Sequence, residues 1–407
     1  MVLRIAVLHH ARSFFPLDLF ERTRAVASLI WVLDDEFADD PVSARLLRKL
    51  GTVVDIAGLD DDAAAVRIAE ESPDGIVSFV DDHIVRAAEL ARRLGLRYHS
   101  PELAHTLTDK RAQREVLAAA GVAEPRFWPV SARSTAAELA DTALQLDFPC
   151  VLKPAEGSGS RGIRMLNSAA ELIELSGSDE AYVVEEYLSD HDDHPEWAAS
   201  YLSVESVVSD GTAHHVALTG RFPLAEPFRE TGNFVPAIAD DALTAQLFSM
   251  VDRAITALGV RDSVLHTDIK LTPAGPRLIE INGRLGGRPG FVLAEVCELN
   301  LFQLACLVAA GVPVSLDGLA KVRGVGFWLM MQPPVSASIL TSLDGLDEVG
   351  RYPGVRVVDA KRHVGQRVDW RAGTDSQVLT VRGAVDDHES LGRLVGRVQG
   401  AVRVSYA

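Results

Sequence analysis

Three oxygen-bearing side chains, Asp268, Glu280 and Asn282, stand in two short alternating segments on either side of a Thr-Pro-Ala-Gly-Pro turn. If the chain folds back at Ala274, Asp268 lies opposite Glu280 and His266 opposite Asn282, because successive side chains of a strand point to opposite faces. Carboxylate and amide oxygens suit a hard divalent cation such as Mg²⁺. The hairpin therefore predicts a metal site, and an ordinary half-exposed hairpin is the alternative.

The same register makes further predictions about this hairpin. Lys270 is expected opposite Leu278 on the polar side. The other side is expected to be apolar, apart from one threonine, and to carry Leu265, Thr267, Ile269, Ile279 and Ile281. Arg284 follows in a glycine-rich exit, next to the predicted metal site.

A second stretch that could do chemistry contains Lys153 and then the run Glu-Gly-Ser-Gly-Ser-Arg-Gly at residues 156–162. Glycine and serine let backbone N–H groups approach phosphate oxygens closely. An apolar segment rather than a helix follows, so neither a P-loop nor a dinucleotide-binding loop fits. We predict strand, glycine-rich loop, strand, with a flexible hairpin tip as the alternative. Only six of the 40 basic residues are lysines, which favours a specific role for a lysine in such a motif.

The elements that must position these groups follow from the hydrophobic pattern. Residues 1 to about 105 alternate short apolar runs with helical patterns, which predicts a small parallel sheet with helices on its faces. Ligands at such a sheet bind beyond the carboxyl ends of the strands. Two polar loops there, residues 9–12 and 81–83, are substrate contacts or capping residues, and Asp82 is the residue to test. A single helix is expected over residues 289–310.

Composition narrows the class of protein. With 407 residues and 47% hydrophobic content, the chain is too long for one core and is expected to form several lobes. A net charge of -17 argues against binding nucleic acid or an anionic membrane surface. Cys150, Cys297 and Cys306 have no metal or disulfide spacing, which favours reduced thiols in a cytoplasm. We expect neither a signal peptide nor a membrane span, because the apolar runs are short or interrupted.

Together these motifs resemble the ATP-grasp superfamily of carboxylate–amine ligases over about residues 106–287. Lys110 and Lys153 resemble the two phosphate-side lysines of the family, and residues 156–162 resemble the loop that closes over ATP. Residues 185–188 resemble the segment that holds adenine. The resemblance implies that ATP is bound by Lys110, Lys153, Glu156, Gly157, Ser158, Gly159, Ser160, Gly162, Glu185, Glu186, Tyr187, Leu188 and Glu196.

The resemblance also implies roles at the other end of the site. Asp268, Glu280 and Asn282 match the Mg²⁺ ligands of the family; two ions are expected, with Mn²⁺ as a substitute. Arg284 matches the arginine that faces the transferred phosphate, and Arg284 and Lys153 are the expected catalytic residues. The expected substrate contacts are Asp82, Glu205, Glu230, His266, Arg284 and Gly286.

Two departures from the family pattern stand out. Tyr201 occupies a position where many members have an acidic ribose contact, which leaves Glu196 and Glu205 open for that role. The first metal ligand is Asp268 where the family often has glutamate, so its carboxylate is one methylene shorter.

Within the superfamily, the motifs Tyr-Leu-Ser-Val-Glu, His-Thr-Asp-Ile-Lys and Leu-Ile-Glu-Ile-Asn-Gly-Arg-Leu-Gly-Gly are most similar to the L-amino acid ligases, which form dipeptides or acylated amino acids. This implies a carboxylate activated as an acyl phosphate, an amino-acid amine as acceptor, and release of ADP and phosphate. A γ-glutamyl-type ligase, a carboxylase-like enzyme and a nucleotide-binding module without ligation are the alternatives. A homodimer is an expectation of the family alone.

The predicted fold is therefore α/β and α+β with several lobes. A Rossmann-like parallel sheet is expected in residues 1–105. The two lobes of an ATP-grasp fold follow, the small lobe with the glycine-rich loop in residues 106–185 and the large lobe with the metal site in residues 186–315. Residues 316–407 are expected to form an α+β lid or packing domain without chemistry of its own.

Overall fold

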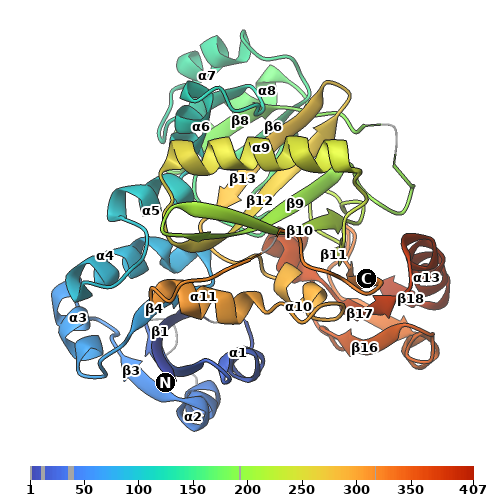
Figure 1. Cartoon of the computed structure of the whole chain (residues 1–407). Coiled ribbons are helices and arrows are strands. Elements are labelled where there is room, and N and C mark those ends of the chain that lie inside the picture. Colours follow the sequence, from blue (N-terminus) through green and yellow to red (C-terminus); the bar gives the residue numbers. More distant parts are fainter. Residues whose placement is uncertain (1, 11–13, 35–40, 192–193, 317) are drawn as a thin grey trace.

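The computed structural model describes residues 2–10, 14–34, 41–191, 194–316 and 318–407 (Figure 1). Ala11 and Arg12 of the first polar loop lie outside these residues. The amino-terminal part is a parallel sheet in the order β3-β2-β1-β4, which confirms the predicted sheet. Its strands are β1 (Leu3–His9), β2 (Ala27–Leu33), β3 (Thr52–Asp55) and β4 (Gly75–Ser78). Its helices are α1 (Pro16–Thr23), α2 (Pro41–Leu50), α3 (Asp61–Ala69), the short η1 (Asp81–His83) and α4 (Ile84–Leu94).

The small lobe is an antiparallel sheet in the order β5-β8-β6-β7, covered by helices on one side (Figure 1). Its strands are β5 (Phe127–Val130), β6 (Cys150–Pro154), β7 (Arg164–Leu166) and β8 (Tyr182–Glu186). Helices α7 (Ala136–Ala143) and α8 (Ala169–Ile173) pack on this sheet. Helices α5 (Pro101–Thr108) and α6 (Lys110–Ala119) precede it and contribute Leu107 and Leu117 to the core of the large lobe. Because β6 and β7 flank the glycine-rich run, the predicted strand, loop, strand is confirmed.

The large lobe is a long antiparallel sheet in the order β13-β12-β9-β10-β11-β14-β17-β16. Helix α9 (Asp241–Leu258) lies across this sheet (Figure 1) and buries the apolar side of the helix against it. The strands before the carboxyl-terminal region are β9 (Tyr201–Ser209), β10 (Thr212–Arg221), β11 (Gly232–Val235), β12 (Ser263–Thr272) and β13 (Gly275–Asn282).

The carboxyl-terminal strands β14 (Val325–Met331), β16 (Val355–Ala360) and β17 (Leu379–Val385) extend this large sheet. A small separate pair joins β15 (Leu340–Asp344) to β18 (Arg403–Tyr406). The helices of this region are α12 (Leu346–Val349), η2 (Trp370–Ser376) and α13 (His388–Ala401).

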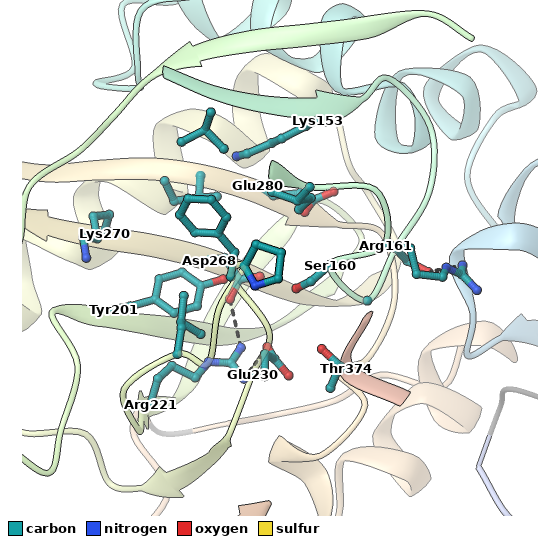
Figure 2. Close-up of a pocket in the computed structure, with 18 of the residues that line it drawn as sticks. Lys153, Ser160, Arg161, Tyr201, Arg221, Glu230, Asp268, Lys270, Glu280 and Thr374 are labelled. Carbon is teal, nitrogen blue, oxygen red and sulfur yellow. Dashed lines mark hydrogen bonds and ion pairs between the residues drawn. The ribbon is translucent and has the colours of Figure 1, made fainter. Parts of the chain in front are cut away.

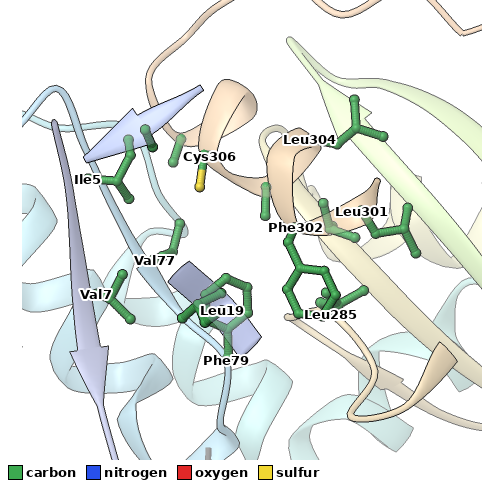
Figure 3. Packing of buried hydrophobic residues seen from close by; sticks show 14 of the residues in the cluster. Ile5, Val7, Leu19, Val77, Phe79, Leu285, Leu301, Phe302, Leu304 and Cys306 are labelled. Carbon is green, nitrogen blue, oxygen red and sulfur yellow. The ribbon is translucent and has the colours of Figure 1, made fainter. Parts of the chain in front are cut away.

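The single helix expected over residues 289–310 is wrong, because two helices form there: α10 (Pro289–Leu293) and α11 (Leu301–Ala309). Asn300 starts α11, since its side chain accepts hydrogen bonds from the backbone N–H groups of Phe302 and Gln303. Residues of α11, including Phe302 and Cys306, pack against Ile5, Val77 and other side chains of the amino-terminal sheet (Figure 3). This core fixes the amino-terminal sheet against the large lobe.

Within the described residues, no helix has both the length and the apolar character that crossing a membrane requires.

Candidate active site

A cavity of about 1020 Å³ lies where the amino-terminal sheet, both lobes and the carboxyl-terminal region meet (Figure 2). Most of the residues predicted from the sequence line it. These are Asp82, Lys110, Lys153, Glu156, Gly157, Ser158, Gly159, Ser160, Glu185, Glu186, Tyr187, Leu188, Glu196, Glu230, His266, Asp268, Glu280, Asn282 and Arg284. The strands, loops and domains that carry them are far apart in the chain, so the cavity is a product of the whole fold.

Three predicted residues do not line the cavity. Gly162 ends the glycine-rich loop, where a Cβ atom would come within 2.8 Å of Pro154. Glu205 is fully buried and accepts a hydrogen bond of 2.9 Å from Nδ1 of His266. Gly286 lies against the same ring, since a Cβ there would be 2.7 Å from Nδ1 of His266. Glu205 and Gly286 thus orient His266 from behind, and of the two acids left open for ribose only Glu196 lines the cavity.

The predicted pairing at the metal end of the hairpin is confirmed. His266 of β12 pairs with Asn282 of β13, and Asp268 pairs with Glu280. The side chains of all four line the cavity. The oxygen donors therefore come together as their alternation predicts.

Beyond Asp268 the predicted register is wrong, because a β-bulge follows it. Ile269 pairs with Leu278 and Lys270 with Arg277, so Ile279 is the extra residue of β13. Leu278 consequently joins the buried core, while Ile279, expected on the apolar side, lines the cavity beside Glu280. The alternation alone could not reveal the extra residue.

The oxygen donors fit a magnesium site. Glu280 and Asn282 face the cavity, and Oε1 of Glu280 lies 3.3 Å from Nζ of Lys110. Asp268 uses Oδ1 for its contact of 2.9 Å with Arg221, and among the described residues Oδ2 has no protein partner. Two carboxylates and an amide that line one cavity are suitable ligands for Mg²⁺.

A buried ion-pair network surrounds Lys153. Its Nζ donates to Oε2 of Glu185 at 2.6 Å, while Arg114 donates to Oε1 of the same carboxylate at 2.8 Å. Burial would raise the pKa of Glu185, but the charges of Arg114 and Lys153 outweigh it and lower the pKa to about 2. Arg114 also donates to the backbone carbonyls of Leu278 and Ile279 at the β-bulge. The network therefore connects Lys153 to the strand that carries Glu280.

The segment expected to hold adenine has its acidic side chains already engaged. Glu185 is bound to Lys153, and Glu186 accepts a hydrogen bond of 2.8 Å from Nε of Arg126. Tyr187, by contrast, is exposed. What this segment can still offer a ligand is therefore its backbone and the side chains of Tyr187 and Leu188.

The glycine-rich loop is held by two other parts of the chain. Nζ of Lys110 donates to the carbonyl of Gly157 at 2.7 Å, and the backbone N–H of Thr374 donates to the carbonyl of Gly159 at 2.9 Å. Gly373 has a φ of 65°, and a Cβ there would lie 2.1 Å from the Gly159 oxygen. The carboxyl-terminal segment thus closes tightly onto the loop, at a residue where glycine is required.

The opposite end of the cavity is organised around Arg221, whose side chain is only 2% exposed (Figure 2). Its guanidinium lies 3.0 Å from Glu230 and 2.9 Å from Asp268. Burial would lower the pKa of Arg221, but these two carboxylates raise it. For His266, burial is likewise outweighed by Glu205 and Asp268, which raise its pKa to about 10. Arg221 is thus held charged among acids, and its Nη2 also lies 2.9 Å from Nε2 of His266.

Arg284 links the metal donors to the amino-terminal sheet. Its guanidinium is bound to Asp81 at the carboxyl end of β4 and lies 3.4 Å from Oδ1 of Asn282. Although burial would lower the pKa of Arg284, Asp81 raises it. The neighbouring polar loop reaches the cavity through both Asp81 and Asp82.

Several cavity residues were missed in the sequence. They include Arg221, Thr374 and Asp375, and Arg114, which does not line the cavity, stands behind Glu185. Arg114 follows Lys110 by four residues on one helix, which could have suggested a shared face. Arg221 ends an apolar strand, where a charged residue is itself a signal. Thr374 and Asp375 carry no local signal in the sequence.

A comparison with protein families supports the resemblance given by the motifs. Residues 107–288 match the model of the ATP-grasp domain. The match begins just before Lys110 and ends at Arg288, so it spans the glycine-rich loop and the metal donors.

Relatives in sequence cover part of the chain. A protein of Sinorhizobium fredii, "Uncharacterized protein y4rH", is 29% identical over 301 residues, which are 71% of this chain and 59% of that protein. Human carnosine synthase 1 is 30% identical over 288 residues, which are 64% of this chain and 34% of that protein. The chain thus matches less than two thirds of the length of each of these relatives.

A solved structure shares the whole fold. The L-amino acid ligase of Bacillus licheniformis superposes with a TM-score of 0.78 at 18% identity, over 100% of this chain and 99% of that one. At this identity the likeness concerns the fold, in which the amino-terminal sheet, both lobes and the carboxyl-terminal region all have counterparts.

Proposed function

We propose that this chain, which carries an ATP-grasp domain in residues 107–288, is an ADP-forming ligase that joins a carboxylate to the amine of an amino acid. The observation that carries the proposal is the content of one cavity: two lysines beside a glycine-rich loop, oxygen donors for Mg²⁺, and Arg284. The names of two relatives, a carnosine synthase and an L-amino acid ligase, support this choice of substrates.

In this proposal Lys110 and Lys153 neutralise the phosphates of ATP, and the backbone of residues 185–188 holds the adenine. Phosphoryl transfer needs positioning and charge neutralisation rather than a protein nucleophile, which suits a site rich in cations. Lys110 is paired with Glu280 in this structure, and MgATP offers each of them a partner of opposite charge. Glu196 is the proposed ribose contact because it lines the cavity.

Glu280, Asn282 and Asp268 would hold Mg²⁺, with two ions proposed. When bound, the metal offsets the charge on the phosphate oxygens. The chain itself keeps these ligands in place: the β-bulge turns Ile279 toward the cavity beside Glu280, and Arg221 fixes Asp268 through Oδ1.

The first step is attack of a carboxylate oxygen on the γ-phosphorus of ATP, which breaks the bond to ADP and gives an acyl phosphate. The amine then attacks the acyl carbon, the C–O bond breaks, phosphate leaves, and the amine loses a proton. In this proposal the guanidinium of Arg284 binds the acyl phosphate by charge-assisted hydrogen bonds. Because water would hydrolyse this intermediate, the contact between Gly159 and Thr374 that closes the loop is part of the mechanism.

The test is a screen of amino-acid pairs with ATP and Mg²⁺, which measures nucleotide products, phosphate and product mass. We expect ADP and phosphate only when both substrates are present, and a product lighter than their sum by one water. Formation of AMP and pyrophosphate would contradict the acyl-phosphate mechanism, and bicarbonate-dependent ADP release would indicate a carboxylase-like enzyme instead.

A further inference from the structure

Three buried arginines stand at the substrate end of the cavity, and they differ in their partners. Arg221 is bound by Glu230 at 3.0 Å and by Asp268 at 2.9 Å. Arg284 is bound by Asp81, and it also donates to a backbone carbonyl at 3.1 Å. The third arginine, Arg288, follows four residues later and lines the same cavity. Its pairing is much weaker.

The side chain of Arg288 makes one polar contact with the described residues, a long one of 3.4 Å from Nη1 to Oε2 of Glu230. The other oxygen of this carboxylate already binds Arg221 at 3.0 Å, so two guanidinium groups share one acid. The side chain of Arg288 is 18% exposed, and its remaining N–H donors are open to the cavity. Arg288 is therefore an underpaired cation on the cavity wall.

The pKa shifts of the three arginines show the same difference in pairing. Burial lowers the pKa of Arg288, and the charges of Glu230 and Asp375 do not compensate for it. For Arg221 and Arg284 the carboxylate partners outweigh burial and raise the pKa. A partly buried cation without a full ion pair destabilises the protein unless an anion, such as a group of the ligand, pairs with it. The open donors of Arg288 are where a ligand can supply that anion.

The location indicates which anion this is. In Figure 2, Glu230 lies on the far side of Asp268 from Lys153. Arg288 contacts Glu230 there, whereas Arg284 lies beside Asn282 and the metal donors. The carboxylate that is activated belongs with Arg284, so the anion at Arg288 is a different group.

We propose that Arg288 binds the free carboxylate of the amine-bearing substrate, so that this substrate is an amino acid and not a simple amine. The inference rests on the proposed ligase function. An amino-acid acceptor keeps its own carboxylate throughout the reaction, and this charge must be matched inside the cavity. A guanidinium suits it because it can donate two parallel hydrogen bonds to one carboxylate.

Hydroxylamine provides the test, because it attacks an acyl phosphate but has no carboxylate. The enzyme is given ATP, Mg²⁺, a productive amino-acid pair from the screen and hydroxylamine, and the amide and hydroxamate products are measured together. In Arg288→Gln we expect the amide-to-hydroxamate ratio to fall roughly 100-fold. In Arg288→Lys we expect a fall of roughly 10-fold, because lysine keeps the positive charge but cannot donate two parallel hydrogen bonds as a guanidinium does.

The outcomes separate this inference from the function on which it rests. If the wild-type protein formed neither amide nor hydroxamate with any amino acid, the proposed ligase would be contradicted. Hydroxamate from the wild type with an unchanged ratio in both variants would overturn the role of Arg288. A parallel loss of both products in a folded variant would also overturn it, since the carboxylate would then belong to the activated substrate. If Arg288→Gln does not fold, the product ratio of Arg288→Lys alone decides the test.

A second arm changes the substrate instead of the protein. The acceptor amino acid is replaced by its carboxamide, which removes the negative charge and keeps the amine. The wild-type protein should favour the acid over the carboxamide roughly 100-fold in kcat/KM, and Arg288→Gln should show almost no preference. An equal preference in both proteins would contradict the assignment.

Discussion

Lys153 and Arg221 both form buried ion pairs, at opposite ends of one cavity, but with inverse arrangements. At the nucleotide end, one acid, Glu185, lies between two cations, Lys153 and Arg114. At the substrate end, one cation, Arg221, lies between two acids, Glu230 and Asp268. The first cluster thus pairs one acid with two cations, and the second pairs one cation with two acids.

This difference matches what each end is proposed to bind. The two cations around Glu185 suit the phosphates of ATP, whereas Asp268, which Arg221 holds through Oδ1, keeps Oδ2 for Mg²⁺. The two clusters also differ in how the chain builds them. Lys153 and Glu185 lie on adjacent strands of one small sheet, but Arg221, Glu230 and Asp268 come from β10, a loop and β12. The substrate end thus depends on the order of strands in the large sheet.

The largest effect is expected from Glu280→Gln, at the metal site between the two ends. Loss of the anionic oxygen removes a metal ligand and leaves Lys110 without its partner, so kcat/KM for phosphate release should fall about 10³-fold, or about 4 kcal/mol. The melting temperature should change little, because the side chain is 26% exposed with one cationic partner. Exposed Glu174→Gln is the control. Normal turnover in Glu280→Gln would refute the metal assignment.

Arg221→Gln tests how much the ion pairs of the substrate end contribute to the stability of the folded protein. The substitution leaves Asp268 and Glu230 buried without their cation, which should cost about 3–5 kcal/mol of unfolding free energy, measured by urea denaturation. Arg356→Gln removes an exposed ion pair with Glu295 and should cost at most about 1 kcal/mol. If both variants lost the same small amount, the substrate end would not depend on Arg221.

The nucleotide end makes a prediction about pH. The pKa of Glu185 is about 2 in the folded protein and about 4.5 when unfolded, so the network adds stability above pH 4.5 that is lost as the pH falls toward 2. The contribution is on the order of 3 kcal/mol. Urea unfolding of the wild type and Glu185→Gln at a series of pH values should show a difference that shrinks below pH 4.5. A constant difference would contradict the network.

The smallest effect is expected where the carboxyl-terminal segment closes the loop. In Gly373→Ala the new methyl group would clash with the Gly159 carbonyl, so the loop must move away. The fraction of ADP that forms without amide should then rise roughly tenfold. Gly365→Ala is a matched control, since Gly365 also has a positive φ but has open space around its Cα. If both variants formed the same amount of amide per ADP, the contact between Gly373 and the loop would be dispensable.

Much of the nucleotide end could be predicted from the sequence because its signals are local. Lys153 precedes the glycine-rich loop directly, and alternation alone placed Asp268 opposite Glu280. The prediction failed beyond Asp268, where one extra residue changes which side chains face the cavity. It also failed at residues 294–300, where Asn300 starts a new helix inside an apolar stretch.

The substrate end could not be predicted to the same extent. Arg221 and Glu230 are nine residues apart around a turn, and their partner Asp268 lies on a strand much later in the chain. Asp81 reaches Arg284 across 203 residues of sequence. The first contacts depend on the order of strands in the large sheet, and the second depends on packing of the amino-terminal sheet against the large lobe. A single sequence carries no local pattern for either.

The most direct test of the central claim follows one oxygen atom. The protein is incubated with ATP, Mg²⁺ and the productive amino-acid pair, whose carboxylates carry ¹⁸O. If a carboxylate oxygen attacks the γ-phosphorus and the C–O bond then breaks, one ¹⁸O atom should appear in the released phosphate, together with ADP and amide. Amide formation with unlabelled phosphate, or with AMP and labelled AMP phosphate, would contradict the acyl-phosphate account.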